Sequence, residues 1–542
     1  MRRIAALLIL SVAGIASSVH AQTISWSQVF NGPSEPPVGA TLGSTEDPRA
    51  IAVDAAGNIF AGGVTQSFEN ATGGVKLKFV PHDDFVVITY DGAGQQLWGS
   101  VFDFPTLGDD QSSPATRSGV DSMAAMIATP EGGVVAVGRA TTRYSEDGFF
   151  GFTQAGVVKF NADGEVAWNQ LLGDGAVSTV ATAVVGDGGF GMYVGGGTAL
   201  ATNEQDSFVT YLDGAGVPVW TAAAGYPFSQ VIQVVRDPAG ACVALAGISG
   251  GGCKLVRVGA GGVSTTQEIP ALAGGATGVG VALASDGCAI VAGSLGGDLI
   301  LAKVHPSGSQ VWSTTWRPSD GRTVVSRAVS VDAAGVIRVA GHVGSIAGLP
   351  ADLFVATFDS TSGASKSFRA KDTGLNRAES SARGGVTIEP SGRTLVAGFV
   401  STGVAGDNDY AIGVFDATDA SRDWSARWSN PTNPQVDDRA AAIMALPNGN
   451  IAVVGRSDGG ASSVDIATIV LTPPATVACD GIDFNNNTVF PEDADVIDFF
   501  EVLAGGECST GLCNDIDFNN NTVFPEDADV IDFFEVLAGG EC

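Results

Sequence analysis

Basic residues are scarce in this 542-residue chain. It has 27 Lys and Arg against 58 Asp and Glu, so its formal net charge is 27 − 58 = −31. Residues 479–542 contain 16 acidic residues and no Lys or Arg at all. A field of this sign repels nucleic acids and anionic membranes and favours cations or basic partners. We therefore exclude DNA, RNA and lipid surfaces as partners.

Long apolar runs are also missing. After residue 21, no run approaches the roughly 18 apolar residues that a membrane-spanning helix needs. The chain begins with Arg2 and Arg3, an apolar stretch at 4–15 and a small-residue site at 19–21. This order is typical of a cleaved secretory signal. We expect 1–21 to be a signal peptide and the protein to be Sec-exported, either secreted or held at the cell surface.

Histidine is nearly absent, which restricts catalysis. Removing the signal leaves only His82, His305 and His342, each in a different part of the chain. A Ser-His-Asp or Cys-His arrangement would have to be built from these three. We expect no catalytic residues, and we interpret 82–84 (His-Asp-Asp) as an exposed loop rather than as part of a metal site.

Only seven cysteines occur, an odd number for an exported chain. Cys242 and Cys288 occupy equivalent places in neighbouring repeats, where buried small side chains are expected; a Cys242–Cys288 bridge is the alternative. The fate of Cys253 is left open. The other four cysteines lie in the tail, one at each end of each copy, and the two in a copy are 29 positions apart. This spacing predicts one disulfide bond in each copy, Cys479–Cys508 and Cys513–Cys542.

A degenerate repeat fills the region between signal and tail. Eight segments consist of an apolar strand, a Gly-containing turn and a second apolar strand, from IAVDAAGNIFAGG (51–63) to AIMALPNGNIAVVGR (442–456). Most are followed by a third strand, an Asp/Gly turn and a Trp-bearing strand, as in DLILAKVHPSGSQVW (298–312). Such turns require positive φ, which the 74 glycines supply. Four short strands per unit predict an all-β fold, a β-propeller of about eight blades, with seven as the alternative.

The ends of the array predict how the ring closes. The eighth unit stops at 466–471 without a Trp strand, whereas an orphan Trp strand lies at 24–30. We expect the N-terminal strand to complete the last blade, which removes the free sheet edges. The tryptophans after equivalent turns are expected to pack between blades. NADGEVAW (161–168), loosely similar to the Asp-box turn of sialidases, is interpreted in the same way.

These units resemble the SBBP-type bacterial β-propeller repeat, in which a GNxYVxG-like hairpin precedes DAFVxKxxPxGxxxW. The resemblance covers roughly residues 23–472, and 298–312 is the best match. We assign 22–472 to the propeller and 473–478 to a linker. Propellers serve as lectins, hydrolases, lyases and scaffolds, so the fold does not identify the ligand.

The tail, 479–542, contains the same 27 residues twice, IDFNNNTVFPEDADVIDFFEVLAGGEC at 482–508 and 516–542. Each copy places oxygen-bearing side chains at positions 1, 3 and 5 of a loop and carboxylates near its end, the ligand order of an EF-hand. Asn-Thr replaces the usual Asp-Gly, so we expect weak Ca²⁺ binding or none; the alternative is a metal-free loop capped by its Asn side chains. The candidate ligands are Asp483, Asn485, Asn487, Val489, Asp493, Asp495, Asp517, Asn519, Asn521, Val523, Asp527 and Asp529.

A short amphipathic helix is predicted after each loop. Apolar residues recur at helical spacing and form one face, on which the two helices can pack together or dock a partner. The members of this predicted docking face are Val496, Phe499, Phe500, Leu503, Val530, Phe533, Phe534 and Leu537.

The loop and helix pair resembles dockerin modules, in particular the GC-type dockerin pattern DFNNDGxFPxxxDxxDFxxxFxGGxC. The resemblance implies docking outside the cell to a cohesin-like or other envelope protein. We expect an exported, non-catalytic binding or scaffold protein anchored by this tail. The alternatives are a carbohydrate-active enzyme that hydrolyses or cleaves polysaccharides, and a structural surface or adhesion protein.

Overall fold

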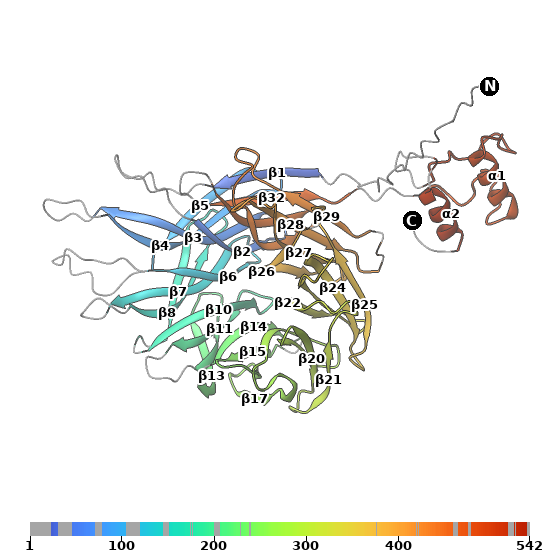
Figure 1. The fold of residues 1–542 in the computed structure, drawn as a ribbon. Coiled ribbons are helices and arrows are strands. Elements are labelled where there is room, and N and C mark those ends of the chain that lie inside the picture. Colours follow the sequence, from blue (N-terminus) through green and yellow to red (C-terminus); the bar gives the residue numbers. More distant parts are fainter. Residues whose placement is uncertain are drawn as a thin grey trace, which may run out of the picture. The chain divides into compact units, whose positions relative to one another are not determined.

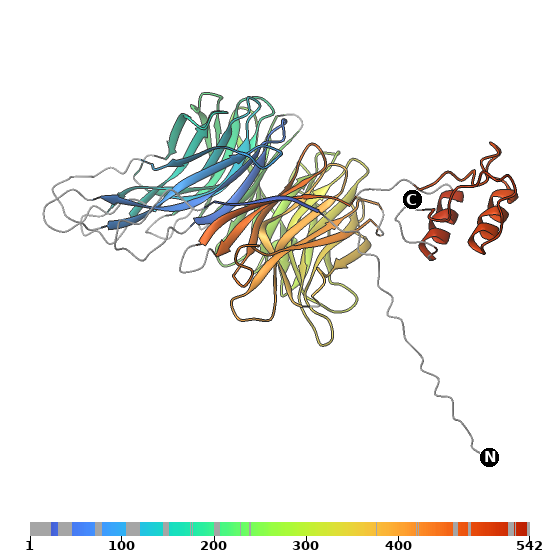
Figure 2. The same ribbon diagram turned by 90° about the horizontal axis from the view of Figure 1, so that it is seen from above.

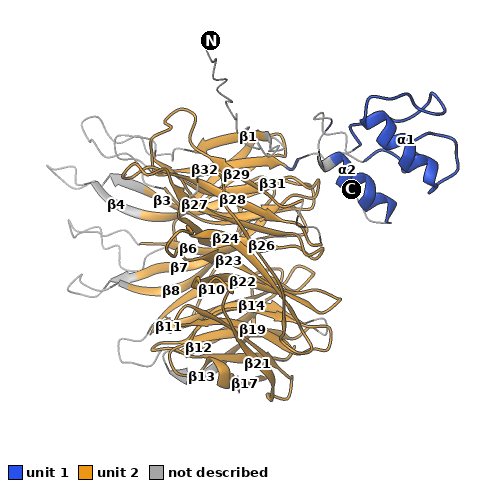
Figure 3. Ribbon diagram, turned by 45° about the vertical axis from the view of Figure 1, so that its right-hand side comes forward, with its two compact units in different colours: residues 1–21, 473–542 blue, residues 22–472 orange. Residues whose placement is uncertain are grey.

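The structure is a computed structural model in which the chain forms two compact units. One comprises Gln22–Thr472, and the other Pro473–Cys542 with Met1–Ala21 (Figure 3). The structure describes residues 23–30, 46–70, 79–104, 120–144, 151–173, 175, 177–199, 206–227, 229–237, 240–375, 377–418, 420, 422–458, 464–474, 479–518, 525 and 527–538.

The first unit is a β-propeller of eight blades (Figure 1; Figure 2). Six blades are separate four-stranded antiparallel sheets, and the remaining two are joined by a single parallel bridge between Gly384 and Ala442. This confirms the predicted all-β fold, and within the described residues it decides the blade count in favour of eight over seven.

Blades 1 to 4 contain the first half of the ring. Their strands are β2 (Glu46–Val53), β3 (Ile59–Asn70), β4 (Phe79–Tyr90) and β5 (Gln96–Phe102); β6 (Ser122–Ala128), β7 (Val134–Tyr144), β8 (Gly151–Phe160) and β9 (Val166–Leu172); β10 (Ser178–Gly186), β11 (Met192–Ala199), β12 (Asp206–Leu212) and β13 (Pro218–Pro227); and β14 (Ser229–Arg236), β15 (Cys242–Ile248), β16 (Cys253–Val258) and β17 (Ser264–Glu268).

Blades 5 to 8 complete it, and a short 3₁₀ helix, η1 (Pro270–Leu272), precedes blade 5. Their strands are β18 (Thr277–Leu283), β19 (Ala289–Leu295), β20 (Asp298–Val304) and β21 (Gln310–Trp316); β22 (Val324–Val331), β23 (Val336–Val343), β24 (Asp352–Asp359) and β25 (Ser365–Lys371); β26 (Glu379–Ile388), β27 (Thr394–Ser401), β28 (Asn408–Phe415) and β29 (Trp424–Trp428); and β30 (Arg439–Ala445), β31 (Ile451–Asp458), β32 (Val464–Thr472) and β1 (Thr23–Phe30).

The N-terminal strand closes the ring, as predicted. β1 pairs antiparallel with β32, from Thr23 opposite Thr472 to Phe30 opposite Ile466, and so forms the outer strand of blade 8 (Figure 1). Trp26 on β1 then donates its Nε1–H to the carbonyl of Gly92 in blade 1, at 3.2 Å. The first strand of the chain therefore ties the last blade to the first.

Tryptophans connect the blades around the ring. Trp98 donates its Nε1–H to Ala162 O at 2.8 Å, and its ring lies against the turn glycine Gly164 of the next blade. Trp220 and Trp312 donate in the same way to the next turn, at 3.0 and 3.1 Å. The same ring-on-glycine contact recurs for Trp26, Trp98, Trp168, Trp220 and Trp312 on Gly94, Gly164, Gly216, Gly262 and Gly363. The predicted role of these residues in packing between blades is confirmed, including Trp168 of the Asp-box-like segment.

One local interpretation was wrong. Residues 82–84 do not form an exposed loop, because they lie within β4, where Asp83 pairs with Gln66 and Asp84 with Thr65. The Asp84 carboxyl group is almost fully buried. Strand β4 begins about six residues earlier than its apolar segment, since it pairs with the whole length of β3.

The second unit contains two helices, α1 (Asp493–Leu503) and α2 (Asp527–Leu537) (Figure 3). Glu492 caps α1 through a capping box with Asp495. Four phenylalanines form its buried core, namely Phe484, Phe499, Phe518 and Phe533. None of the helices in the described residues is long and apolar enough to cross a membrane.

Candidate functional site

The first tail loop folds around its own oxygen atoms. The Asp483 carboxylate accepts the backbone N–H groups of Asn487 at 3.0 Å and of Thr488 at 2.8 Å. The Asn487 amide oxygen accepts the N–H of Val489 at 2.7 Å. The predicted ligands at positions 1 and 5 thus hold the loop in a tight turn. The loop is therefore held by bonds from its own side chains to its backbone.

The closing carboxylate is Asp495 rather than Asp493. Asp495 is buried and accepts the N–H groups of Glu492 at 3.2 Å and of Asn485 at 3.5 Å, whereas Asp493 is exposed at the helix start. The Asn485 side-chain amide donates to Asp498 at 2.9 Å. Asp483, Asp495 and the side-chain amides of the loop all offer oxygen atoms, the ligand type that a hard cation such as Ca²⁺ prefers.

The residue in the usual Gly position is strained. Thr488 has φ 71° and its neighbour Asn486 has φ 53°. Left-handed backbone is unfavourable for a β-branched residue, so Thr488 opposes the turn that the loop must make. In the second copy, Asp529 is buried like its counterpart Asp495, and Asp517 is buried whereas its counterpart Asp483 is only partly buried. Asn519, Asn521, Val523 and the side chain of Asp527 lie outside the described residues. Ca²⁺ binding stays a prediction.

The predicted docking face is mostly core. Phe499 and Phe533 are fully buried and stack on each other at 4.2 Å between ring centroids. Val496, Leu503, Val530 and Leu537 pack around them. Of the eight predicted residues, only Phe500 and Phe534 are exposed, each at 42 %, and their rings lie 6.0 Å apart.

A second apolar stripe was missed. Ile497 and Ile531 are each 61 % exposed and lie three positions before Phe500 and Phe534. This i, i+3 spacing was the signal that could have found it. We call Ile497, Phe500, Ile531 and Phe534 the apolar patch; it draws two residues from each copy.

The predicted disulfide pairing was wrong. Cys508 is bonded to Cys513, so the described bridge joins the end of one copy to the start of the next instead of stapling each copy. The two copies exchange backbone hydrogen bonds. The Asp480 N–H donates to Phe518 O, and the Asn514 N–H donates to Phe484 O. This exchange brings the end of α1 close to the entry of the second loop. Cys479 is also disulfide-bonded, and Cys542 lies outside the described residues.

The three propeller cysteines are free thiols. Cys242, Cys253 and Cys288 are all buried, so the interpretation as small core side chains is confirmed and the alternative Cys242–Cys288 bridge does not form. Burial raises the pKa of the Cys242 thiol to about 12 and that of Cys253 to about 11. Such thiols are not nucleophiles at neutral pH.

The histidines make structural contacts. His305 lies in a turn, where its Nδ1 is 2.7 Å from Ser307 Oγ. His342 lies 2.9 Å from Ser381 Oγ and accepts the Ser381 N–H. Burial, helped by the charge of Arg327, lowers the pKa of His342 to about 4, so it is neutral at pH 7. The side chain of His82 lies outside the described residues.

Three carboxyl groups meet between blades 1 and 2. Asp84, Asp103 and Asp121 bring one oxygen each within 4.8 Å of the others. Asp121 accepts the N–H groups of Phe104 at 3.0 Å and Thr141 at 2.8 Å, and burial raises its pKa to about 7.

The position of Asp121 recurs in other blades. Glu379, at the start of β26, accepts the N–H groups of Thr373 at 2.6 Å and Leu353 at 3.3 Å, both in the preceding blade. Thr179 on β10 likewise accepts the N–H of Ala155 at 2.9 Å. Because residues at or next to the start of an inner strand repeatedly clamp the previous blade, Asp121 is primarily a structural group.

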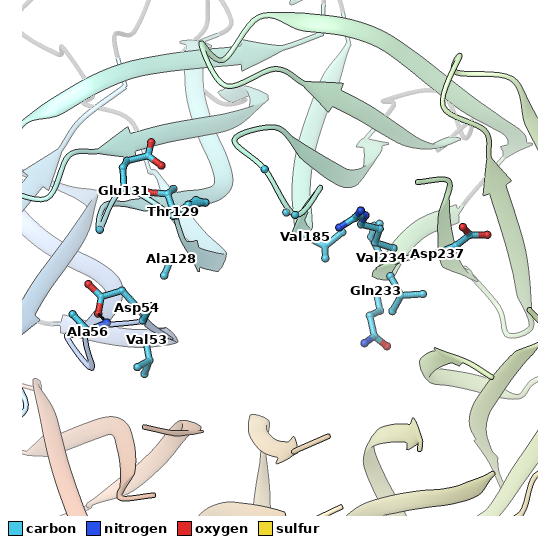
Figure 4. Close-up of a pocket in the computed structure, with 18 residues that line it drawn as sticks. Val53, Asp54, Ala56, Ala128, Thr129, Glu131, Val185, Gln233, Val234 and Asp237 are labelled. Carbon is cyan, nitrogen blue, oxygen red and sulfur yellow. Dashed lines mark hydrogen bonds between the residues drawn. The ribbon is translucent and has the colours of Figure 1, made fainter. Parts of the chain in front are cut away.

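One pocket opens between the inner turns of blades 1 to 4, with a volume of about 1160 Å³. Figure 4 shows Asp54, Glu131, Gln233 and Asp237 around it. Asp54 accepts the N–H groups of its own turn at 2.8 and 2.9 Å, and Glu131 pairs with Lys159. These two carboxylates thus hold a turn of blade 1 and the lysine of β8 in place.

Comparison with known proteins yields no named family. No protein-family model matches the chain, and no curated protein does. Among solved structures, the Dos1 propeller is similar with a TM-score of 0.47 and 8 % identity, over 83 % of this chain and 95 % of that one. The WD40 domain of SCAP from fission yeast is similar with a TM-score of 0.42 and 10 % identity, over 83 % of this chain and 98 % of that one. Virginiamycin B lyase from Staphylococcus aureus is similar with a TM-score of 0.37 and 11 % identity, over 82 % of this chain and 99 % of that one. All three are matches at low sequence identity.

Proposed function

We propose that this protein is an exported, non-catalytic β-propeller that binds or scaffolds other molecules and is anchored to an extracellular or envelope partner by its dockerin-like tail. The observation that carries the proposal is the apolar patch on a tail unit that has its own aromatic core. Four large apolar side chains remain exposed there although the unit buries four phenylalanines. Exposed apolar clusters rimmed by charge are typical of protein-binding surfaces.

Charge supports a basic partner for the tail. The patch is carried by two helices that contain only acidic charged residues, so a partner with an apolar centre and a basic rim is the complementary surface. The near-identical geometry of Phe500 and Phe534 offers the partner two equivalent contacts. Ca²⁺ in the loops would rigidify the entry to both helices; the residues that would hold it are Asp483, Asn485, Asn487 and Asp495, with the Val489 carbonyl.

The two alternative functions have less support. A polysaccharide hydrolase needs a pair of carboxyl groups placed on either side of the bond to be cleaved, whereas Asp54, Glu131 and Asp121 hold backbone N–H groups or Lys159. A purely structural surface protein does not require the apolar patch to face solvent.

The test is capture on the full-length protein. Immobilised wild type is exposed to exported and envelope proteins with Ca²⁺ and with chelator, beside a Phe500→Asp/Phe534→Asp variant. Leu512→Asp is the matched control, because Leu512 is 67 % exposed in the tail but outside the patch. The proposal expects a partner that wild type and Leu512→Asp retain and the double variant loses. Retention of the same proteins by all three, or by none, contradicts it. Loss with chelator assigns a cation to the loops.

A further inference from the structure

A second pocket, of about 840 Å³, lies in the central channel of the propeller. Every one of the eight blades contributes to it through its innermost strand, β2, β6, β10, β14, β18, β22, β26 or β30. Its lining contains five arginines and a single acid, Asp47. The arginines are Arg49, Arg139, Arg327, Arg439 and Arg456. This is a strong concentration of positive charge in a chain with only 27 Lys and Arg and a net charge of −31.

A regular backbone feature aims side chains into this channel. In each innermost strand the pairing register shifts near the same place, for example between Pro48 and Ala50 and between Ser326 and Ala328. Such a bulge leaves one residue unpaired and redirects its side chain. The residues at the bulge in seven blades are Arg49, Ala124, Thr182, Ile232, Val279, Arg327 and Ala441, and all seven line the pocket.

The fold does not require arginine at these positions. Five of the seven bulge residues are alanine, threonine, isoleucine or valine, so the same backbone forms with short or apolar side chains. Arg49 and Arg327 therefore serve something other than blade geometry. Two further arginines, Arg139 and Arg456, lie on the second strand of blades 2 and 8, each directly after a glycine. Each pairs with a residue of the innermost strand, Arg139 with Ser122 and Arg456 with Arg439.

Acidic side chains pair with three of these arginines. Asp47 pairs with Arg49, and Asp437 is shared by Arg439 and Arg456. Arg439 also lies over the ring of Phe399, at 4.5 Å. Arg139 forms no ion pair within the described residues, and its Nε has no hydrogen-bond partner there.

The arginines occupy one side of the channel. They come from blades 6, 8, 1 and 2, whereas blades 3 to 5 contribute neutral residues such as Thr182, Gln230 and Val279. Low-dielectric walls focus the field of such an arc into the channel. Planar guanidinium groups bind carboxylate and phosphate oxygens in pairs.

We propose that the central channel is a binding site for a small organic polyanion carrying carboxylate or phosphate groups. The arginine arc binds the charged groups, and the neutral wall of blades 3 to 5 contacts the rest of the molecule. The volume matches a ligand of small-molecule size. This site would give the propeller a ligand of its own, independent of what the tail binds.

The experiment is calorimetric titration of the full-length protein with citrate and with inorganic pyrophosphate at low ionic strength. We expect saturable one-to-one binding that weakens as salt is added. Arg139→Gln and Arg327→Gln should each weaken it on the order of ten-fold. Arg317→Gln is the control, because Arg317 follows an outer strand and pairs with Asp298 outside the pocket. Arg139→Lys keeps the charge without the planar fork and should also bind more weakly.

The two probes distinguish the source of the ligand. Tighter binding of citrate indicates a carboxylate ligand, and tighter binding of pyrophosphate a phosphate ligand. The proposal is overturned if neither probe binds saturably, or if Arg139→Gln and Arg327→Gln, shown by their melting temperatures to be folded, bind as tightly as wild type does.

Discussion

Replacing Gly164 by alanine tests the contact that links neighbouring blades. Gly164 has φ +84°, and a Cβ built there would lie 2.6 Å from the ring of Trp98. That ring is fixed, because its Nε1–H is bonded to Ala162 O at 2.8 Å. The left-handed backbone costs alanine about 1–2 kcal/mol, and forcing the ring aside adds about 1–3 kcal/mol. We expect Gly164→Ala to lower the free energy of unfolding by about 2–5 kcal/mol.

A matched glycine separates the two contributions. Gly240 has φ +86°, but a Cβ there would have nothing within 4 Å. Gly240→Ala should therefore cost only the conformational part, about 1–2 kcal/mol. Urea denaturation of both variants measures the difference. Trp98→Ala should then reduce the cost of Gly164→Ala to that of Gly240→Ala, because the clashing ring is gone. Equal losses for Gly164→Ala and Gly240→Ala in the wild-type background would refute the packing argument.

Three further predictions concern the clamp and the tail. Burial raises the pKa of Asp121 to about 7. The native state therefore binds more protons than the unfolded state between about pH 4 and 7. The stabilisation that this carboxyl group contributes is lost as the pH rises through that window, by on the order of 4 kcal/mol at most. Asp121→Asn should flatten the decline in unfolding free energy between pH 4.5 and 7.5, and an unchanged decline would assign it to other groups. Thr488→Gly should raise the free energy of unfolding of the tail by about 1 kcal/mol, because glycine adopts the φ of 71° at this position without strain. A lower melting temperature for this variant would contradict the strain. Replacing Cys508 and Cys513 by serine should lower the free energy of unfolding of the tail by only about 2 kcal/mol, because the bridge closes a short loop. Non-reducing peptide mapping after cleavage at acidic residues checks the pairing, and a disulfide-linked Cys508–Cys479 peptide would disprove it.

The propeller could be predicted from the sequence because its determinants are local. Each hairpin has its own turn residues, such as Asp54 and Gly57, and its own run of apolar residues. The orphan strand at 24–30 and the missing Trp strand after 466–471 were enough to indicate which strand closes the ring. Trp98 and its equivalents could be recognised as packing residues from their fixed place after each turn.

The tail was predicted less well because its contacts join the two copies. Helical spacing marked Phe499 and Phe500 as one face, but it does not show that the second copy covers Phe499 and leaves Phe500 exposed. Equal spacing of the cysteines favoured a staple within each copy. The exchange of backbone bonds between copies places Cys508 beside Cys513 instead.

The sequence by itself determined the repeating four-strand unit, the closure of the ring by its first strand and the acidic duplicated tail, because each depends on turn chemistry, periodicity or composition within a short segment. Only the tertiary structure decided that arginines from four blades meet in one channel, and that the four side chains of the apolar patch are exposed while Phe499 and Phe533 are buried. Arg49 and Arg327 are far apart in the chain, and each is unremarkable in its own strand. They come together because every inner strand bulges toward the common axis, which is a property of the closed ring and of no single repeat.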